Sequence, residues 1–93
     1  MNLLEDARLR INDIDSKMAA LFELRMQAVA DVAKYKAENG IPVFDSSREA
    51  EVIEKNRKFI KDPQYEEFYI DFLQHTMDVS KRYQKKVLED KDI

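Results

Sequence analysis

The chain has 93 residues, of which 38% are charged and 44% hydrophobic, and its formal net charge at pH 7 is −3. Because this balance gives no basic field, nucleic acid is excluded as an expected partner. The sequence contains no Cys, which excludes disulfides, thiolate metal sites and cysteine nucleophiles. The sequence has no pattern typical of a signal peptide and no apolar stretch long enough to span a membrane. We therefore expect a cytoplasmic protein, which fits the absence of Cys.

Turn-forming residues are scarce. Gly40 is the only glycine, and Pro42 and Pro63 are the only prolines. Folds that contain strands need many tight turns, so the composition predicts an all-α fold, in a single domain over residues 1–93. A lone chain of this size buries only about two-thirds of its unfolded surface, so a homo-oligomer is expected.

A first, very long helix is predicted over residues 3–38. Its apolar residues recur at spacings of three and four, as one side of a helix requires: Leu4, Ala7, Ile11, Ile14, Met18, Leu21, Ala28, Val32 and Tyr35. At 1.5 Å per residue this helix is about 54 Å long, more than one small chain can cover, so its apolar side needs a partner helix. The segment from Asn39 to Pro42 ends it, because Gly40 favours the left-handed helix end and proline disfavours helix before it.

Two further helices follow, a short one over 46–60 and a long one over 63–88. Ser46 and Glu49 have the spacing of a capping box, and Asp45 is an equally good cap. Asp62 before Pro63 is typical of a helix start. An apolar stripe marks the last helix: Tyr65, Tyr69, Phe72, Val79, Tyr83 and Val87.

Polar residues interrupt the apolar sides of both long helices. Arg25 occupies a position where burial is expected, and Lys36, eleven residues later, points to the same side. Thr76, Ser80 and Gln84 form a ladder at i, i+4 and i+8. Each residue alone can be explained as an outward-reaching cation or a satisfied core polar group. Together they predict a small buried pocket that binds an anion.

The start of the second helix adds a cation and a carboxylate, Arg48 and Glu49. Two interpretations stay open here: Glu49 is the capping-box acid and Arg48 is solvated, or both belong to the pocket. His75 has no second metal ligand or nucleophile beside it, so it is predicted to be a solvated helix residue. No metal or cofactor is expected.

Four parts of the sequence, taken in this order, resemble the all-helical chorismate mutases over nearly the whole chain. They are ARLRINDID, LFELRMQAVADVAKYK, PVFDSSREAEVI and the pair Ser80 and Gln84. The resemblance implies a stand-alone, cofactor-free isomerase that forms an intertwined homodimer and converts chorismate to prephenate, on the shikimate-derived route to phenylalanine and tyrosine. Val32 and Met77 fit the family's pocket wall, whereas Lys81 stands where some members have an apolar residue.

The resemblance also implies a role for each polar residue of the pocket. Arg25 and the partner subunit's Arg8 bind the two substrate carboxylates, and Lys36 and Gln84 donate hydrogen bonds to the ether oxygen. Glu49 and the backbone near Asp45 accept from the ring hydroxyl. Arg48 and Ser80 complete the contacts to the carboxylates and the ring.

Helix geometry gives a separate argument for a shared site. Arg8 and Arg25 are seventeen residues apart, about 25 Å along one helix, which is too far to hold one small ligand. Antiparallel packing of two copies about an axis near Met18 and Ala19 brings them together, and the small Ala19 and Ala20 permit close approach. Two rival functions stay open: an isochorismate pyruvate lyase on the same scaffold, and a helical dimerisation module without catalysis.

Overall fold

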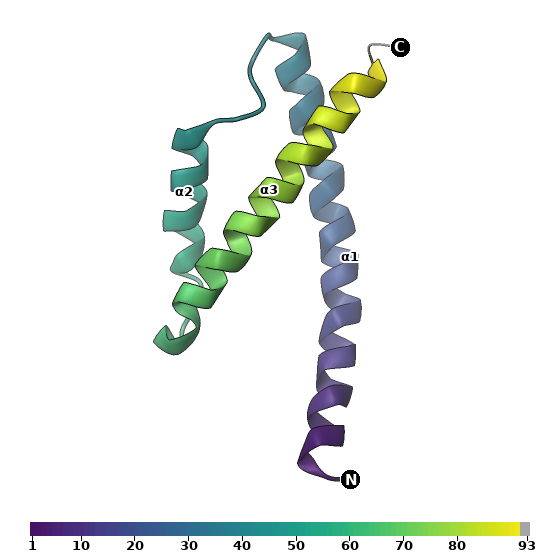
Figure 1. Ribbon diagram of the computed structural model, residues 1–93, viewed down its shortest axis with the longest axis vertical. Coiled ribbons are helices and arrows are strands. Elements are labelled where there is room, and N and C mark those ends of the chain that lie inside the picture. The colour runs from purple at the N-terminus through teal and green to yellow at the C-terminus, as the bar shows by residue number, and fades with distance from the viewer. Residues whose placement is uncertain (92–93) are drawn as a thin grey trace.

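The computed structural model describes residues 1–91 of the chain, so the last two residues of the predicted domain lie outside the described residues. It contains helices α1 (Leu3–Glu38), α2 (Ser46–Arg57) and α3 (Glu66–Lys91), with a short 3₁₀ helix η1 (Pro63–Tyr65) before α3. No strand occurs within residues 1–91, and the predicted all-α class is confirmed. In Figure 1, α3 crosses the C-terminal half of α1 and α2 lies beside α3, while the N-terminal half of α1 extends alone.

Local side-chain and backbone contacts explain where α1 begins and ends. The Asn2 side chain accepts a hydrogen bond of 2.8 Å from the backbone N–H of Glu5, which satisfies one of the free donors of the first turn. At the other end, Gly40 has a φ of 65°, and the N–H of Ile41 donates to the carbonyl oxygen of Lys36 at 2.8 Å. This is a Schellman-type end, which a glycine adopts without steric cost.

The start of α2 is capped by Asp45, whose carboxylate accepts from the backbone N–H of Arg48 at 3.0 Å. Of the two caps that the sequence offered, the structure uses Asp45, and Ser46 is the first helical residue. The helix ends at Arg57, three residues before the predicted end at Ile60, because the chain tightens there into hydrogen bonds between residues three apart.

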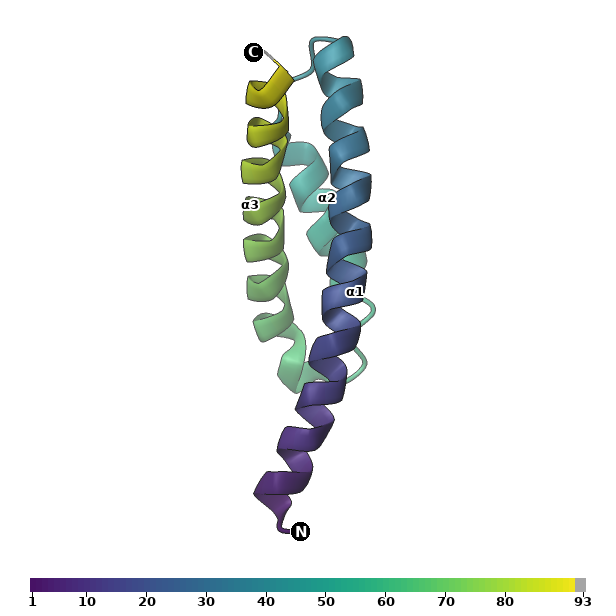
Figure 2. The ribbon, with the colours of Figure 1, turned by 90° about the vertical axis from the view of Figure 1, so that its right-hand side faces the viewer.

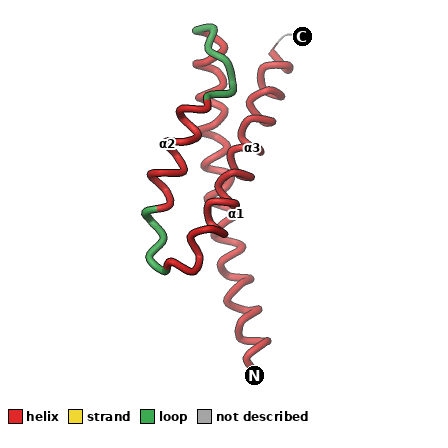
Figure 3. Tube along the Cα trace, turned by 60° about the vertical axis from the view of Figure 1, so that its left-hand side comes forward, coloured by secondary structure: helices red, strands yellow, loops and turns green. Residues whose placement is uncertain are grey.

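The last helix also begins later than predicted. Asp62 does cap a helix with Pro63 at its first position, but that helix is η1, a single 3₁₀ turn. Regular α-helix begins at Glu66 and continues to Lys91, three residues beyond the predicted end at Leu88. Two loops, shown in Figure 3, connect the helices, and the first returns the chain from the end of α1 to α2.

The single chain is long and thin, with principal extents of 54 × 28 × 14 Å. Figure 2 shows the C-terminal part of α3 beside the C-terminal half of α1, where Figure 1 shows the two helices crossing. Among the described residues, the buried apolar side chains belong to these two helices: Val29 and Ala33 of α1, and Leu73 and Met77 of α3. By contrast, five apolar side chains of the α1 stripe are 45–64% exposed: Leu4, Ile11, Ile14, Met18 and Leu21. Within residues 1–91, no helix is long and apolar enough to cross a membrane.

Candidate functional site

A groove of about 170 Å³ is lined by residues of α1, the first interhelix loop, α2 and α3. Val29, Val32 and Met77 contribute apolar wall. Six of the eight residues that the sequence predicted for the site line this groove: Arg25, Asp45, Arg48, Glu49, Ser80 and Gln84. Segments that are up to 59 residues apart in sequence, from Arg25 to Gln84, thus meet at one place, as a binding site requires.

Arg25 of α1 is joined to Ser80 of α3. The guanidinium donates a hydrogen bond from Nη1 to Ser80 Oγ, and the same hydroxyl donates to the carbonyl oxygen of Thr76 at 3.0 Å. The partner that the described chain offers Arg25 is therefore neutral, and the positive charge remains available to an anion. Thr76 itself does not line the groove, since its hydroxyl donates to the carbonyl oxygen of Phe72 at 2.8 Å. Of the three residues of the predicted ladder, Ser80 and Gln84 line the groove and Thr76 does not.

Lys36 lies beside the groove without lining it. Its half-buried ammonium donates from Nζ to the carbonyl oxygen of Val43 at 2.9 Å, and Val43 is a lining residue. This bond ties the first loop back onto the last turns of α1. An ammonium group carries three donors, so Lys36 has donors left for a ligand.

Gln84, like Ser80, is a buried polar residue of the groove, and the resemblance predicts that its amide donates to the substrate. The residue is only 7% exposed, and its Oε1 is buried without a hydrogen-bond partner among residues 1–91. An unpaired buried polar atom is costly, by about 1–3 kcal/mol, and native structures contain few such atoms. Gln84 also lines the groove, and its NH₂ group is not the buried, unpartnered atom, so this group is suited to donate to a ligand in the groove.

Glu49 is held by two donors from α3. Lys81 Nζ lies 3.0 Å from Glu49 Oε2, and Gln74 Nε2 donates to Oε1 at 3.3 Å. The interpretation of Glu49 as a capping-box acid is therefore wrong, because its carboxylate turns toward α3 and Asp45 provides the cap. Arg48 lines the groove at its edge, where its guanidinium pairs with Glu51 at 2.8 Å and both side chains are largely exposed.

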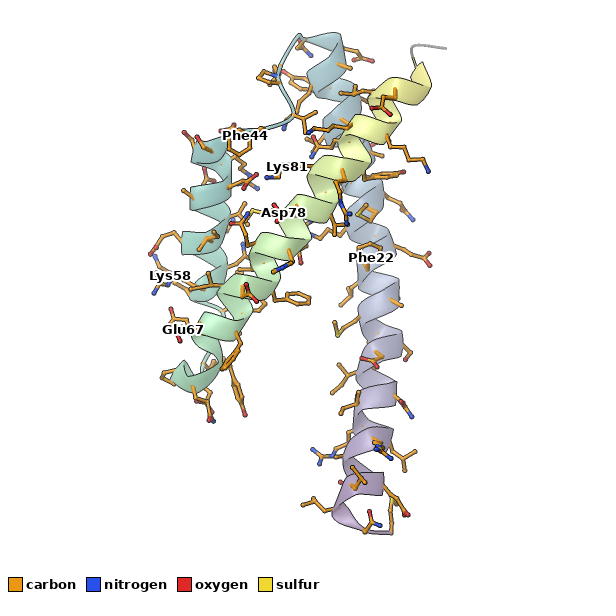
Figure 4. The ribbon with its side chains drawn as sticks, in the orientation of Figure 1. Phe22, Phe44, Lys58, Glu67, Asp78 and Lys81 are labelled. Carbon is orange, nitrogen blue, oxygen red and sulfur yellow. The ribbon has the colours of Figure 1, made fainter. Side chains whose placement is uncertain are left out.

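Lys81 is a groove residue whose partners sequence reasoning missed. Besides Glu49, its ammonium contacts Asp78 Oδ1 at 3.2 Å and lies 5.0 Å from the centre of the Phe44 ring (Figure 4). The hydrogen bond to Glu49 raises the pKa of Lys81, and the hydrogen bond from Lys81 is the largest cause of the lowered pKa of Asp78. The spacing of Asp78 and Lys81 signals their pairing, but only the fold brings Glu49 to them.

Arg8 is not brought to the groove within one chain. It is exposed on the N-terminal half of α1, which extends beyond α2 and α3 (Figure 1). Its distance from Arg25, about 25 Å along a single straight helix, is consistent with that placement. Its predicted role therefore depends on a second copy of the chain.

His75 lies outside the groove, as predicted. Its ring is exposed, and Nδ1 is hydrogen-bonded to the carbonyl oxygen of Asp71 at 2.8 Å, a contact that raises the pKa of His75. In the part of the chain that the structure describes, no cluster of His, Asp and Glu side chains has the arrangement of a metal site.

A wider depression of about 520 Å³ lies on a different side of α1, next to Tyr83. Phe22, labelled in Figure 4, and Met26 provide its apolar lining, and its charged groups are the carboxylates of Glu23 and Asp31. Carboxylates repel a small organic anion, so the groove at Arg25 is the better candidate site.

The protein is all-helical, and guanidinium, ammonium and amide donors lie in or beside its groove, a set of groups that suits a small organic anion. The model of the family "Chorismate mutase type II" matches residues 7–85, a range that includes all eight predicted site residues. The chain belongs to this family. A chorismate mutase of Methanocaldococcus jannaschii is 33% identical over 88 residues, which cover 94% of this chain and 89% of that protein.

A second relative shares only part of its length with the chain. The T-protein of Haemophilus influenzae is 32% identical over 57 residues, which cover 61% of this chain and 15% of that protein. No solved structure gives a significant match.

Proposed function

We propose that the chain catalyses the Claisen rearrangement of chorismate to prephenate, a step toward phenylalanine and tyrosine. The reaction is a unimolecular pericyclic shift, in which the ether C–O bond breaks as a new C–C bond forms. Catalysis then consists of holding a flexible dianion in a compact conformation and stabilising the negative charge that grows on the ether oxygen. Guanidinium, ammonium and amide donors supply both functions.

The two carboxylates of the substrate are bound by arginines. Arg25 is supported by Ser80 and has no carboxylate partner among the ion pairs of the described residues, so it is ready to form a forked contact with one substrate carboxylate. The partner subunit's Arg8 binds the other carboxylate. Arg48 assists from the edge of the groove by exchanging its contact with Glu51 for the substrate.

The ether oxygen is stabilised by Gln84 and Lys36. The single observation that carries this proposal is the buried amide of Gln84, whose Oε1 has no partner among residues 1–91, in the same groove as Arg25. Its NH₂ group donates to the ether oxygen, and Lys36 donates through a proton not used by Val43. Both donors gain strength as negative charge develops, which lowers the barrier rather than only tightening binding.

The ring hydroxyl of the substrate donates to the carboxylate of Glu49. The backbone near Asp45, which lines the same groove, is a second acceptor for that hydroxyl. Glu49 and Asp45 lie on the α2 side of the groove, whereas Arg25 and Gln84 lie on the long helices. The ring hydroxyl is therefore bound on the α2 side of the groove, and the ether oxygen on the side of the two long helices.

The active protein is proposed to be an intertwined homodimer. The exposed apolar stripe of α1, from Leu4 to Leu21, is an apolar surface that a single chain leaves in water. Antiparallel packing of two α1 helices buries this stripe and delivers Arg8 to the groove of the other subunit. The cytoplasm, expected from the composition, remains the proposed compartment.

The proposed reaction is tested by incubating purified protein with chorismate and identifying the product by proton NMR. We expect prephenate, at a rate unaffected by prior dialysis against a strong chelator. Pyruvate as the main product identifies the lyase instead. Absence of both turnover and binding of a bicyclic dicarboxylic mimic of the transition state identifies a dimerisation module.

A further inference from the structure

Lys81 makes the least exposed ion pair that joins two helices in the described chain. The Lys81 and Glu49 side chains are 24% and 17% exposed, against 41% and 35% for the Arg57–Glu66 pair. Exposed pairs contribute little because water screens them, but partial burial strengthens both attraction and geometric restraint. The Lys81–Glu49 pair lies in the wall of the groove, so its restraint acts on the site itself.

The contacts of Lys81 fix the ammonium from several sides. Asp78, one helical turn earlier on α3, places its Oδ1 3.2 Å from Lys81 Nζ. The ring of Phe44, a residue of the first loop, has its centre 5.0 Å from the same Nζ. A cation over an aromatic face is attracted by the ring, so Phe44 provides both cover and charge stabilisation. Figure 4 shows Lys81 and Asp78 on α3, with Phe44 near the start of α2.

The carboxylate of Glu49 is thereby held at both oxygens. Oε2 accepts from Lys81 and Oε1 accepts from Gln74, which together oppose rotation of the carboxylate toward solvent. Each carboxylate oxygen accepts up to about two hydrogen bonds, so both contacts leave capacity for a ligand. Without Lys81, Glu49 faces the nearby negative charge of Asp78, which Lys81 otherwise neutralises.

We propose that Lys81 is a positioning residue, which holds the carboxylate of Glu49 in place to accept the ring hydroxyl of the substrate. This inference rests on the function proposed above. It differs from a general attraction of the dianion by one more cation, because positioning of Glu49 affects recognition of the hydroxyl and leaves recognition of the carboxylates largely intact.

The test compares two bicyclic dicarboxylic mimics of the transition state, one with the ring hydroxyl and one without it, by calorimetric titration. Wild-type protein is expected to prefer the hydroxylated compound by about tenfold or more, the effect of one hydrogen bond to a charged group. Lys81→Met, which keeps the apolar stem, should lose most of this preference, and Lys81→Arg should restore part of it. Lys85→Met removes an exposed lysine one turn later and should keep the wild-type preference.

Three results overturn the role of Lys81 while leaving the proposed function standing. They are an unchanged hydroxyl preference in Lys81→Met, an equal weakening of both compounds, and a further loss of preference when Glu49→Gln is added to Lys81→Met. Circular dichroism checks folding, and Lys81→Gln is the second variant if Lys81→Met does not fold. Failure of the wild-type protein to bind either compound overturns the proposed function, and this inference with it.

Discussion

The guanidinium of Arg25 on α1 donates a hydrogen bond to the hydroxyl of Ser80 on α3, two residues that are 55 positions apart in the sequence. Ser80 in turn donates to the backbone of its own helix at Thr76. The hydroxyl therefore fixes the direction of a cation that is proposed to bind a substrate carboxylate. A donor fixed before binding loses less entropy on binding, which favours affinity.

Removal of the Ser80 hydroxyl tests this support. Ser80→Ala should raise KM about three- to tenfold, the size of one hydrogen bond, with a smaller effect on kcat because Arg25 itself remains. Steady-state kinetics with chorismate measure both constants. Thr76→Ala removes a hydroxyl one turn earlier that does not line the groove, and its KM should stay near the wild-type value. Equal effects of the two substitutions would contradict a specific role of Ser80.

The helices were predictable from the sequence because their signals are local. The repeat of apolar residues, Gly40 and the cap before α3 each act within one or two turns. The observed helix bounds differ from the predicted ones at the end of α2 and the start of α3. At both places the chain forms hydrogen bonds between residues three apart, and the sequence does not distinguish such a turn from α-helix.

The site was predictable in part, from polar residues that interrupt an apolar stripe. Arg25, Ser80 and Gln84 stood out for this reason, and the structure places them in one groove. The contact of Lys81 with Glu49 was not predictable, because 32 residues separate them and only the packing of α2 on α3 brings them together. The position of Arg8 depends on a second chain.

Gln84→Glu is expected to make activity depend on acid. A neutral carboxyl group donates to the ether oxygen, whereas a carboxylate only accepts, so activity should be high below the pKa of the new group and fall as the pH rises above it. Burial raises that pKa and the nearby cations lower it. The pH profile of kcat for the variant and for wild type measures the change. Full activity with an unchanged profile would remove Gln84 from the ether site.

Lys36→Ala should lower kcat by about two to three orders of magnitude, the effect of losing one donor to a developing oxyanion. The ammonium contributes mainly in the transition state, so KM should change less than kcat. Single-turnover and steady-state rates with chorismate measure the two effects. Lys34→Ala, an exposed lysine two residues earlier on α1, is the control. A defect of Lys36→Ala confined to KM would contradict the proposed role.

The dimer is tested at the centre of the exposed stripe. Met18→Asp places two carboxylates close together at the proposed axis and should prevent assembly, with loss of folded helix on dilution. Ser16→Asp adds the same charge on the opposite side of α1 and should leave the dimer intact. Sedimentation velocity and circular dichroism over a dilution series measure both. A stable, active monomer of the wild-type chain would contradict the intertwined assembly.

The most direct test of the shared site is the activity of mixed dimers of Arg8→Ala and Arg25→Ala. Each pure variant lacks one carboxylate-binding arginine in every site and should lose most activity. In a mixed dimer, one site receives Arg25 from the first variant and Arg8 from the second, while the other site lacks both. After unfolding and joint refolding of equal amounts, random pairing makes half of the dimers mixed, so about a quarter of all sites should regain wild-type activity. Mixed dimers verified by two affinity tags that stay as inactive as either parent would show that Arg8 does not reach across the interface.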